Sequence, residues 1–124
     1  MKNDTRAVWD CYVSSWNAES GAERRALFAD CLAPDCVYRD PHSVARGWDE
    51  LGETMANFHG RLPGAHFVTT HFWDHHGRCG ARWQLLSAAD VALGEGISYG
   101  EYDGQQRLVA MNAFFDTSES RASA

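Results

Sequence analysis

Several features that would point directly to a membrane or a nucleic acid are missing from this sequence. No apolar run approaches the roughly 20 residues that a membrane-spanning helix needs. The 11 Lys and Arg residues are scattered and the net charge is −6, whereas contacts to nucleic-acid phosphates need grouped cations. We therefore expect neither a membrane nor a nucleic acid among the partners of this chain.

Signals for disulfides, secretion and metal binding are also scarce. The four cysteines form no C-x-x-C pair, and the first ten residues, MKNDTRAVWD, are too polar for the apolar region of a signal peptide. We therefore expect reduced thiols in a cytoplasmic protein. His71, His75 and His76 lie on an expected strand and its hairpin loop rather than on one helix face, and no cysteine spacing supports zinc. We predict no metal site and no cofactor.

Aromatic residues, by contrast, are abundant. Five Trp, six Phe and four Tyr occur among 124 residues, of which 44% are hydrophobic. A chain of this length can bury one substantial core without disulfides or metals. The composition predicts a single globular domain over residues 1–124, with a cavity lined by aromatic rings and a small polar tail at 117–124 that frays.

The first part of the chain shows helical spacing. Apolar residues recur at intervals of three and four over residues 5–18, which predicts an amphipathic helix capped by Asp4 or Thr5. A capping box at residues 20–23 predicts that a second helix begins there, and Pro34 stops it.

A short strand and a third helix are expected next. Residues 36–40 (CVYRD) are typical of a strand that ends at Pro41. Residues 48–59 repeat the helical spacing, and Gly60 is suited to cap that helix at its C-terminus.

The second half of the chain is typical of strands. Two β-branched and aromatic segments within residues 66–86 flank a hairpin loop at 74–77, and two more within 96–116 flank the turn at 103–104. Helices followed by antiparallel strands predict an α+β protein rather than an alternating one. Such a sheet can curl into a half-open cone, which the helices close and which leaves a pocket inside.

The stretch VYRDPHSVARGW, residues 37–48, holds the densest group of chemically useful side chains, with Tyr38, Asp40 and His42 inside five positions. Asp40 has two interpretations. An Asp before proline often ends a strand and hydrogen-bonds its own turn, whereas apolar surroundings would let its carboxyl act as a general base. His42 could meet a substrate or lie exposed in a loop.

The order of these elements resembles the nuclear-transport-factor-2-like superfamily, and within it the SnoaL-like polyketide cyclases and ketosteroid isomerases. The resemblance covers residues 5–116 and is carried by the aromatic residues of the first helix, by YRDP (38–41), by RGWDEL (46–51) and by EYDGQQRLVAMNAFFD (101–116). It implies a cystatin-like α+β barrel, in which a cone-shaped, curved antiparallel sheet and three N-terminal helices enclose a pocket that needs no cofactor.

The resemblance also implies roles for individual residues. Asp40 matches the carboxylate that moves a proton in the isomerase branch, and Tyr12 matches a tyrosine that donates to the substrate oxygen, with His42 as another candidate donor. The isomerases carry a second, protonated acid on the penultimate strand. This chain has Ser98 there, which can donate one hydrogen bond but cannot supply the proton of a strong acid. The residues expected to bind the ligand are Trp16, Tyr38, Phe58, Trp83, Ser98, Met111, Ala113 and Phe115.

Two functions remain open at this point. In the first, Asp40 is the general acid/base of a cofactor-independent isomerase, cyclase or dehydratase that acts on a carbonyl-containing cyclic or polyketide-like molecule. In the second, the chain is a non-catalytic ligand-binding or dimeric scaffold protein. The first function implies a small hydrophobic molecule as partner, whereas in the second the cone either binds such a ligand or is filled by Trp16, Phe58 and Trp83. The resemblance implies a homodimer formed through the open face of the sheet.

Overall fold

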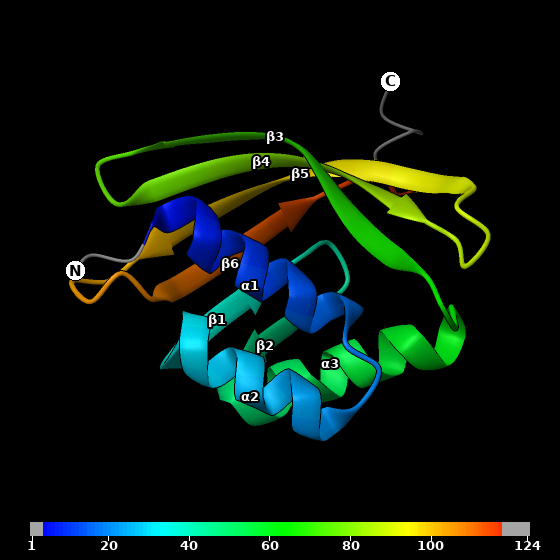
Figure 1. Ribbon diagram of the computed structural model, residues 1–124, viewed down its shortest axis with the longest axis horizontal. Helices are drawn as coiled ribbons and strands as arrows, with labels where there is room; N and C mark the ends of the chain where they lie inside the picture. Colours follow the sequence, from blue (N-terminus) through cyan, green and yellow to red (C-terminus); the bar gives the residue numbers. More distant parts are fainter. Residues whose placement is uncertain (1–3, 118–124) are drawn as a thin grey trace.

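The computed structural model describes residues 4–117 and places three helices on one side of a curved six-stranded sheet (Figure 1). This arrangement confirms the predicted α+β class. Residues 118–124 of the predicted tail lie outside the described residues. In chain order the elements are α1 (Thr5–Asn17), α2 (Gly21–Cys31), β1 (Leu32–Arg39), β2 (Val44–Arg46), α3 (Gly47–Arg61), β3 (His66–His75), β4 (Arg78–Leu86), β5 (Ala92–Tyr102) and β6 (Leu108–Phe114).

The first two helices begin where local side-chain chemistry predicts. The Asp4 carboxylate accepts a hydrogen bond from the Arg6 backbone N–H at 3.1 Å, so Asp4 rather than Thr5 caps α1. The Ser20 hydroxyl accepts one from the Glu23 backbone N–H at 3.1 Å, which confirms the cap predicted for α2.

The end of α3 differs from the prediction. Gly60 lies inside the helix, which continues to Arg61, and the C-cap is Leu62, whose N–H donates to the carbonyl oxygen of Phe58 at 3.0 Å. The residue with positive φ is Gly64, at +79° in the following turn. The chain therefore reverses three residues beyond the end of the helix rather than at its last glycine.

The region around Asp40 contains more strand than the sequence indicates. Strand β1 begins at Leu32, not at residue 36, and includes Pro34 at a point where its pairing with β6 shifts register. Strand β2 was not predicted. It has three residues and pairs antiparallel with β1, with Ala45 opposite Tyr38, so it depends on a neighbouring strand more than on a pattern of its own.

The sheet has the strand order β2-β1-β6-β5-β4-β3. The four long strands β3 to β6 are antiparallel neighbours, as predicted. The β1–β6 pair is parallel, so the sheet is mixed rather than wholly antiparallel. Strands β2 and β3 are its two edges, and the strands curve over the helices without closing a full barrel (Figure 1).

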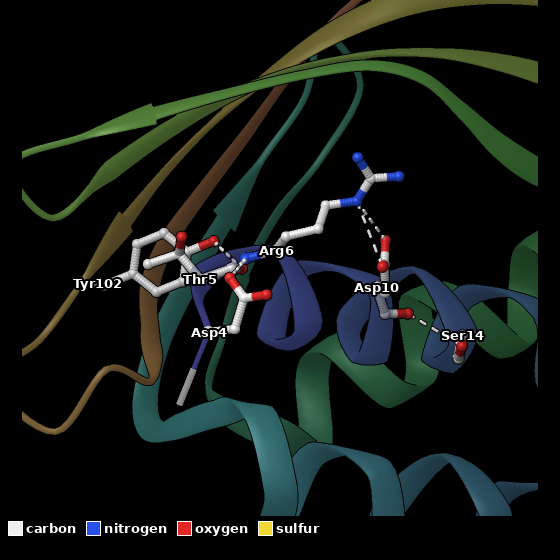
Figure 2. Close-up of polar contacts among 6 residues, drawn as sticks. All are labelled: Asp4, Thr5, Arg6, Asp10, Ser14 and Tyr102. Carbon is white, nitrogen blue, oxygen red and sulfur yellow. Dashed lines mark hydrogen bonds and ion pairs between the residues drawn. The ribbon is translucent and has the colours of Figure 1, made fainter. Parts of the chain in front are cut away.

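Helix α1 is tied to the sheet at its N-terminus (Figure 2). The Tyr102 hydroxyl, at the end of β5, donates to the Thr5 carbonyl oxygen at 2.8 Å. The Thr5 hydroxyl also contacts the Asp74 carboxylate on β3. On the exposed side of the helix, Arg6 forms an ion pair with Asp10 at 3.1 Å. These contacts hold α1 across the sheet with one face buried, formed by Val8, Trp9, Tyr12, Ser15 and Trp16.

The four cysteines are free thiols, and Cys31, Cys36 and Cys79 are buried in the core as small apolar side chains. Among the described residues, no helix is both long and apolar enough to cross a membrane.

Candidate active site

A cavity of about 590 Å³ lies between the helices and the concave face of the sheet. It collects side chains from α1, β1, α3 and the four long strands, although these segments are far apart in the sequence. Ten of the residues predicted from the sequence line it, namely Tyr12, Trp16, Tyr38, Asp40, His42, Phe58, Trp83, Ser98, Ala113 and Phe115. The predicted residue Met111 does not.

Met111 points to the same face of β6 as Ala113, because the two residues are two positions apart, but it lies deeper in the cone. It pairs across the sheet with Gly100, where a Cβ would lie 2.9 Å from the Sγ of Cys79 and 3.2 Å from the Trp9 ring. Met111 is 1% exposed. The narrow part of the cone is therefore filled by packed side chains, and along β6 the cavity begins two residues further on, at the Ala113–Ser98 pair.

Much of the cavity wall is a series of aromatic side chains in contact with one another. Their ring centroids lie 5.3 to 6.1 Å apart, and the series runs Tyr38, Trp16, Phe67, Trp83, Phe115 and His42. Asp40 connects the two end residues, because its carboxylate accepts hydrogen bonds from the Tyr38 hydroxyl and from the His42 backbone N–H. Such a wall offers flat apolar faces and one carboxylate to a bound molecule.

Asp40 both closes a turn and lines the cavity. Its Oδ1 accepts hydrogen bonds from the backbone N–H groups of His42 and Ser43, each at 2.8 Å. Its Oδ2 accepts one from the Tyr38 hydroxyl at 2.6 Å. A carboxylate has about four lone-pair positions, so these three donors leave one for another group. The turn interpretation of Asp40 is therefore confirmed for Oδ1, and a role for this carboxylate as a base stays a prediction.

Tyr38 is a neutral donor to this carboxylate. Burial is the main cause that raises the pKa of Tyr38, and Tyr12 and the hydrogen-bonded Asp40 carboxylate raise it further. The phenol thus keeps its proton and shares it with Oδ2 of Asp40. Tyr38 holds that carboxylate in place beside the cavity.

Tyr12 presents its hydroxyl from α1. Its oxygen accepts a hydrogen bond from the Trp16 indole N–H at 3.0 Å. Burial raises the pKa of Tyr12, and the bond from Trp16 lowers it by less. Tyr12 is therefore a neutral phenol, suited to donate a hydrogen bond rather than to act as a base.

Ser98, on β5, lines the same cavity as Tyr12. Its Oγ accepts a hydrogen bond from the Trp83 indole N–H at 3.0 Å, and Ala113 is its partner in the sheet. Residues 96–100 (GISYG) fit the G-x-S-x-G pattern of serine hydrolases, but the nucleophile of those enzymes lies on a strand-to-helix turn. Here the serine lies within a strand and is bonded to an indole, so the geometry is not that of a nucleophile elbow.

His42 lies at the outer edge of the cavity. Its backbone N–H donates to the Asp40 carboxylate, and the centroid of its exposed ring lies 5.7 Å from that of Phe115. Within residues 4–117, no group of three His, Cys, Asp or Glu side chains is placed to hold a metal ion.

Some lining residues were not predicted from the sequence. Phe67 and Thr69 on β3 line the cavity, and so do the exposed residues Arg61 and Glu95. Residues two apart on a strand share a face, so Thr69 follows once Phe67 is placed in the cavity. Residues 66–69 (HFVT) do not alternate between apolar and polar types, and they therefore do not show which face that is. Arg61 and Glu95 lie on α3 and β5, which are far apart in the sequence, and no local pattern connects them.

No protein-family model matches the sequence, and no curated protein is detectably similar to it. Solved structures with a similar fold do exist. A candidate isomerase of the SnoaL-like family from Agrobacterium tumefaciens has a TM-score of 0.85 and 21% identity, over 91% of this chain and 97% of that one. A candidate ketosteroid isomerase from Kribbella flavida has a TM-score of 0.67 and 19% identity, over 92% and 78% of the two chains.

A candidate polyketide cyclase from Sinorhizobium meliloti has a TM-score of 0.70 at 8% identity, over 90% of this chain and 99% of that one. Because the sequence identities are low, these similarities establish the fold alone and not the activity. The chain has the cone-shaped fold of SnoaL-like and nuclear-transport-factor-2-like proteins, which confirms the architecture predicted from the sequence. Its activity has to be argued from the cavity itself.

Proposed function

We propose that this chain binds a small hydrophobic molecule containing a carbonyl group and moves a proton on the carbon beside that carbonyl, as an isomerase, cyclase or dehydratase. The observation that carries the proposal is the Asp40 carboxylate, which lies in the wall of an aromatic cavity with one acceptor position still free. The isomerase and cyclase assignments of proteins with the same fold are consistent with it.

The proposed reaction begins with proton abstraction. Oδ2 of Asp40 takes a proton from the carbon next to the carbonyl, and the electron pair of that C–H bond moves to form an enolate. The protonated carboxyl can return the proton to another carbon, which gives isomerisation. Alternatively the enolate carbon attacks a second carbonyl of the same molecule, and the alkoxide that forms takes the proton back from the Asp40 carboxyl, which gives ring closure. Loss of water from that product is the dehydratase outcome.

The developing negative charge needs a donor. Tyr12 is suited to this role because it is a neutral, buried phenol whose oxygen already accepts a bond from Trp16. The His42 ring, at the outer edge of the cavity, is the other candidate donor. A preorganised donor in a water-poor cavity stabilises an enolate more than water does.

Hydrogen–deuterium exchange at the carbon beside the carbonyl of 1-tetralone, followed by proton NMR in D₂O, tests the proposal. Asp40→Asn keeps an oxygen for the turn but removes the base, so we expect the catalysed rate to fall by about 100-fold or more. The matched control is Asp35→Asn, an exposed carboxylate of β1 that does not line the cavity. An unchanged rate in Asp40→Asn would remove Asp40 from the mechanism.

A non-catalytic binding protein is the second candidate function. The hydrogen bonds of Asp40 favour this function. Its Oδ1 accepts from two backbone N–H groups and its Oδ2 accepts from the Tyr38 hydroxyl, which is the arrangement of a carboxylate that stabilises a turn. In that case the chain would bind 1-tetralone without accelerating its exchange above the rate in buffer, and Asp40→Asn would change neither quantity.

We also propose a homodimer formed through the uncovered face of the sheet. Trp73, Ile97, Tyr99 and Phe114 are 37% to 59% exposed, and Ile97 pairs directly with Phe114. Exposed apolar side chains gathered on one sheet face favour association. We expect Ile97→Lys to shift the mass measured by light scattering to that of a monomer. Val91→Lys, at a 60% exposed site before β5, should leave the mass unchanged.

A further inference from the structure

The exposed part of the cavity lining, which we call the mouth, carries a cation. Among the described residues that line the cavity, Arg61 is the only Lys or Arg. It lies in the last turn of α3, and its spacing from Thr54 and Phe58, which also line the cavity, places the three on one face of that helix. The Arg61 side chain is exposed and belongs to none of the ion pairs within residues 4–117. Its guanidinium is therefore available to a ligand.

The carboxylates in the lining do not neutralise Arg61. Glu95 is two positions from the exposed Ile97, so strand alternation places both side chains on the uncovered face of the sheet. Asp116 is exposed beyond the end of β6, and Asp40 already accepts three hydrogen bonds. Within the described part of the chain, none of these three acids forms an ion pair with Arg61.

Aromatic rings separate Arg61 from Asp40. Phe58, one turn before Arg61, meets the Trp16 ring edge-on with centroids 5.8 Å apart, and Trp16 contacts Tyr38 at 5.4 Å. The Tyr38 hydroxyl in turn donates to the Asp40 carboxylate. A molecule that lies along the Trp16 ring in this cavity of about 590 Å³ therefore has a carboxylate of the protein at one end and a guanidinium at the other.

We infer that Arg61 is a specificity residue that binds a carboxylate of the ligand at the mouth of the cavity, so that the ligand is a hydrophobic keto acid. The N–H groups of a guanidinium match the two oxygens of a carboxylate. At the mouth the ligand carboxylate stays in contact with water, so the pair forms without the large desolvation cost of a buried one. The inference rests on the ligand cavity of the proposed function and names the class of its ligand, but it does not require Asp40 to be a base.

Two probes that differ in charge but not in shape test the inference. 6-Carboxy-1-tetralone is fully ionised at pH 8, and 6-carbamoyl-1-tetralone carries a neutral amide in place of the carboxylate. An exposed ion pair contributes a factor of about 2 to 5 in affinity, so the wild-type chain should bind the acid more tightly than the amide by about that factor in about 20 mM NaCl. In about 500 mM NaCl the preference should shrink, because salt screens exposed charges. Both dissociation constants are measured by ligand-observed NMR titration.

Arg61→Gln separates binding from a purely structural role. A cation in the last turn of a helix also stabilises that helix through its dipole, but this effect does not depend on the charge of a probe. We expect Arg61→Gln to lose the preference for the acid while its affinity for the amide stays within about twofold of the wild type. Arg46→Gln is the matched control, since Arg46 is an exposed arginine at the other end of α3 that does not line the cavity. It should keep the full preference.

Equal binding of the acid and the amide by the wild type would overturn the inference, and so would an undiminished preference in Arg61→Gln. Failure of the wild type to bind either probe would overturn both the inference and the proposed ligand cavity. Loss of the preference in Arg61→Gln, with an exchange rate unaffected by Asp40→Asn, would support Arg61 and refute catalysis by Asp40.

Discussion

Gly96 is the residue at which the packing of the cavity wall can be tested most directly. A Cβ built on Gly96 would lie 2.4 Å from Cζ2 and 2.7 Å from Cη2 of Trp83, and 2.6 Å from the Phe114 carbonyl oxygen. The indole could move only by displacing Phe67 or Phe115 or by entering the cavity. The carbonyl belongs to the backbone of the neighbouring strand β6 and cannot move alone.

The expected cost of Gly96→Ala follows from these contacts. Overpacking of a well-packed site costs about 1–3 kcal/mol. The loss of glycine flexibility in the unfolded chain returns about 0.4–1 kcal/mol. The net effect is a destabilisation of about 1–2 kcal/mol, together with a displaced Trp83 ring and a weakened bond to Ser98.

Gly94 provides the matched control. It lies two residues earlier on the same strand, and a Cβ built there has no heavy atom within 4 Å. Gly94→Ala should therefore be neutral or stabilising by up to about 1 kcal/mol. The two variants should therefore differ by about 1–3 kcal/mol. With a melting-temperature shift of roughly 3–5 °C for each kcal/mol in a domain of this size, Gly96→Ala should melt about 3–15 °C below Gly94→Ala.

The measurement is thermal unfolding of the two variants by circular dichroism, with the indole N–H resonances of the wild type and Gly96→Ala compared by NMR. We expect one indole resonance, that of Trp83, to shift most. Equal melting temperatures for the two alanine variants would refute the close approach of Trp83 to β5. The packing of the Trp83 ring between Gly96, Phe67 and Phe115 would be refuted with it.

Two further predictions concern stability. Tyr102→Phe removes the bond from this hydroxyl to the Thr5 carbonyl oxygen, so urea unfolding should show a loss of about 0.5–1.5 kcal/mol. Tyr99→Phe, at a partly exposed tyrosine of the same strand, should show almost none; equal losses would contradict the anchoring of α1. Burial, and then the Asp35 charge, raise the pKa of Cys36 from 9.0 to about 11. The folded chain thus holds this proton more tightly than the unfolded chain, and stability should fall as the pH rises from about 9 to 11. Urea titrations at pH 8 and 10.5 should show a smaller fall in Cys36→Ala, and an equal fall would contradict the assignment.

Some parts of the site follow from local patterns that the sequence displays. The cap at Ser20 is a local hydrogen bond, and it occurs where predicted. Strand alternation groups the residues that share a face within each strand, and the resemblance then assigned the faces of Trp83, Ser98 and Ala113 to the cavity, which all three line. The cap depends only on residues close together in the chain.

Other features could not be predicted, because they depend on neighbours that are distant in the chain. Met111 points to the same face of β6 as Ala113, yet it is buried in the core. The side chains of Trp9 and Cys79 fill the narrow part of the cone beside its partner Gly100. Strand β2 exists through its pairing with β1. Sequence patterns report how a segment could be buried, but not what covers it.

The sequence by itself determined the helix-then-strand order, the α+β class and the identity of the polar residues around YRDP, since these depend on spacing and turn chemistry along the chain. Only the tertiary structure decided how Asp40 divides its two oxygens between a turn and Tyr38, and that two indoles orient the hydroxyls of Tyr12 and Ser98. The physical reason is that a hydrogen bond depends on the direction and distance of two groups, and the curvature of the sheet over the helices fixes both.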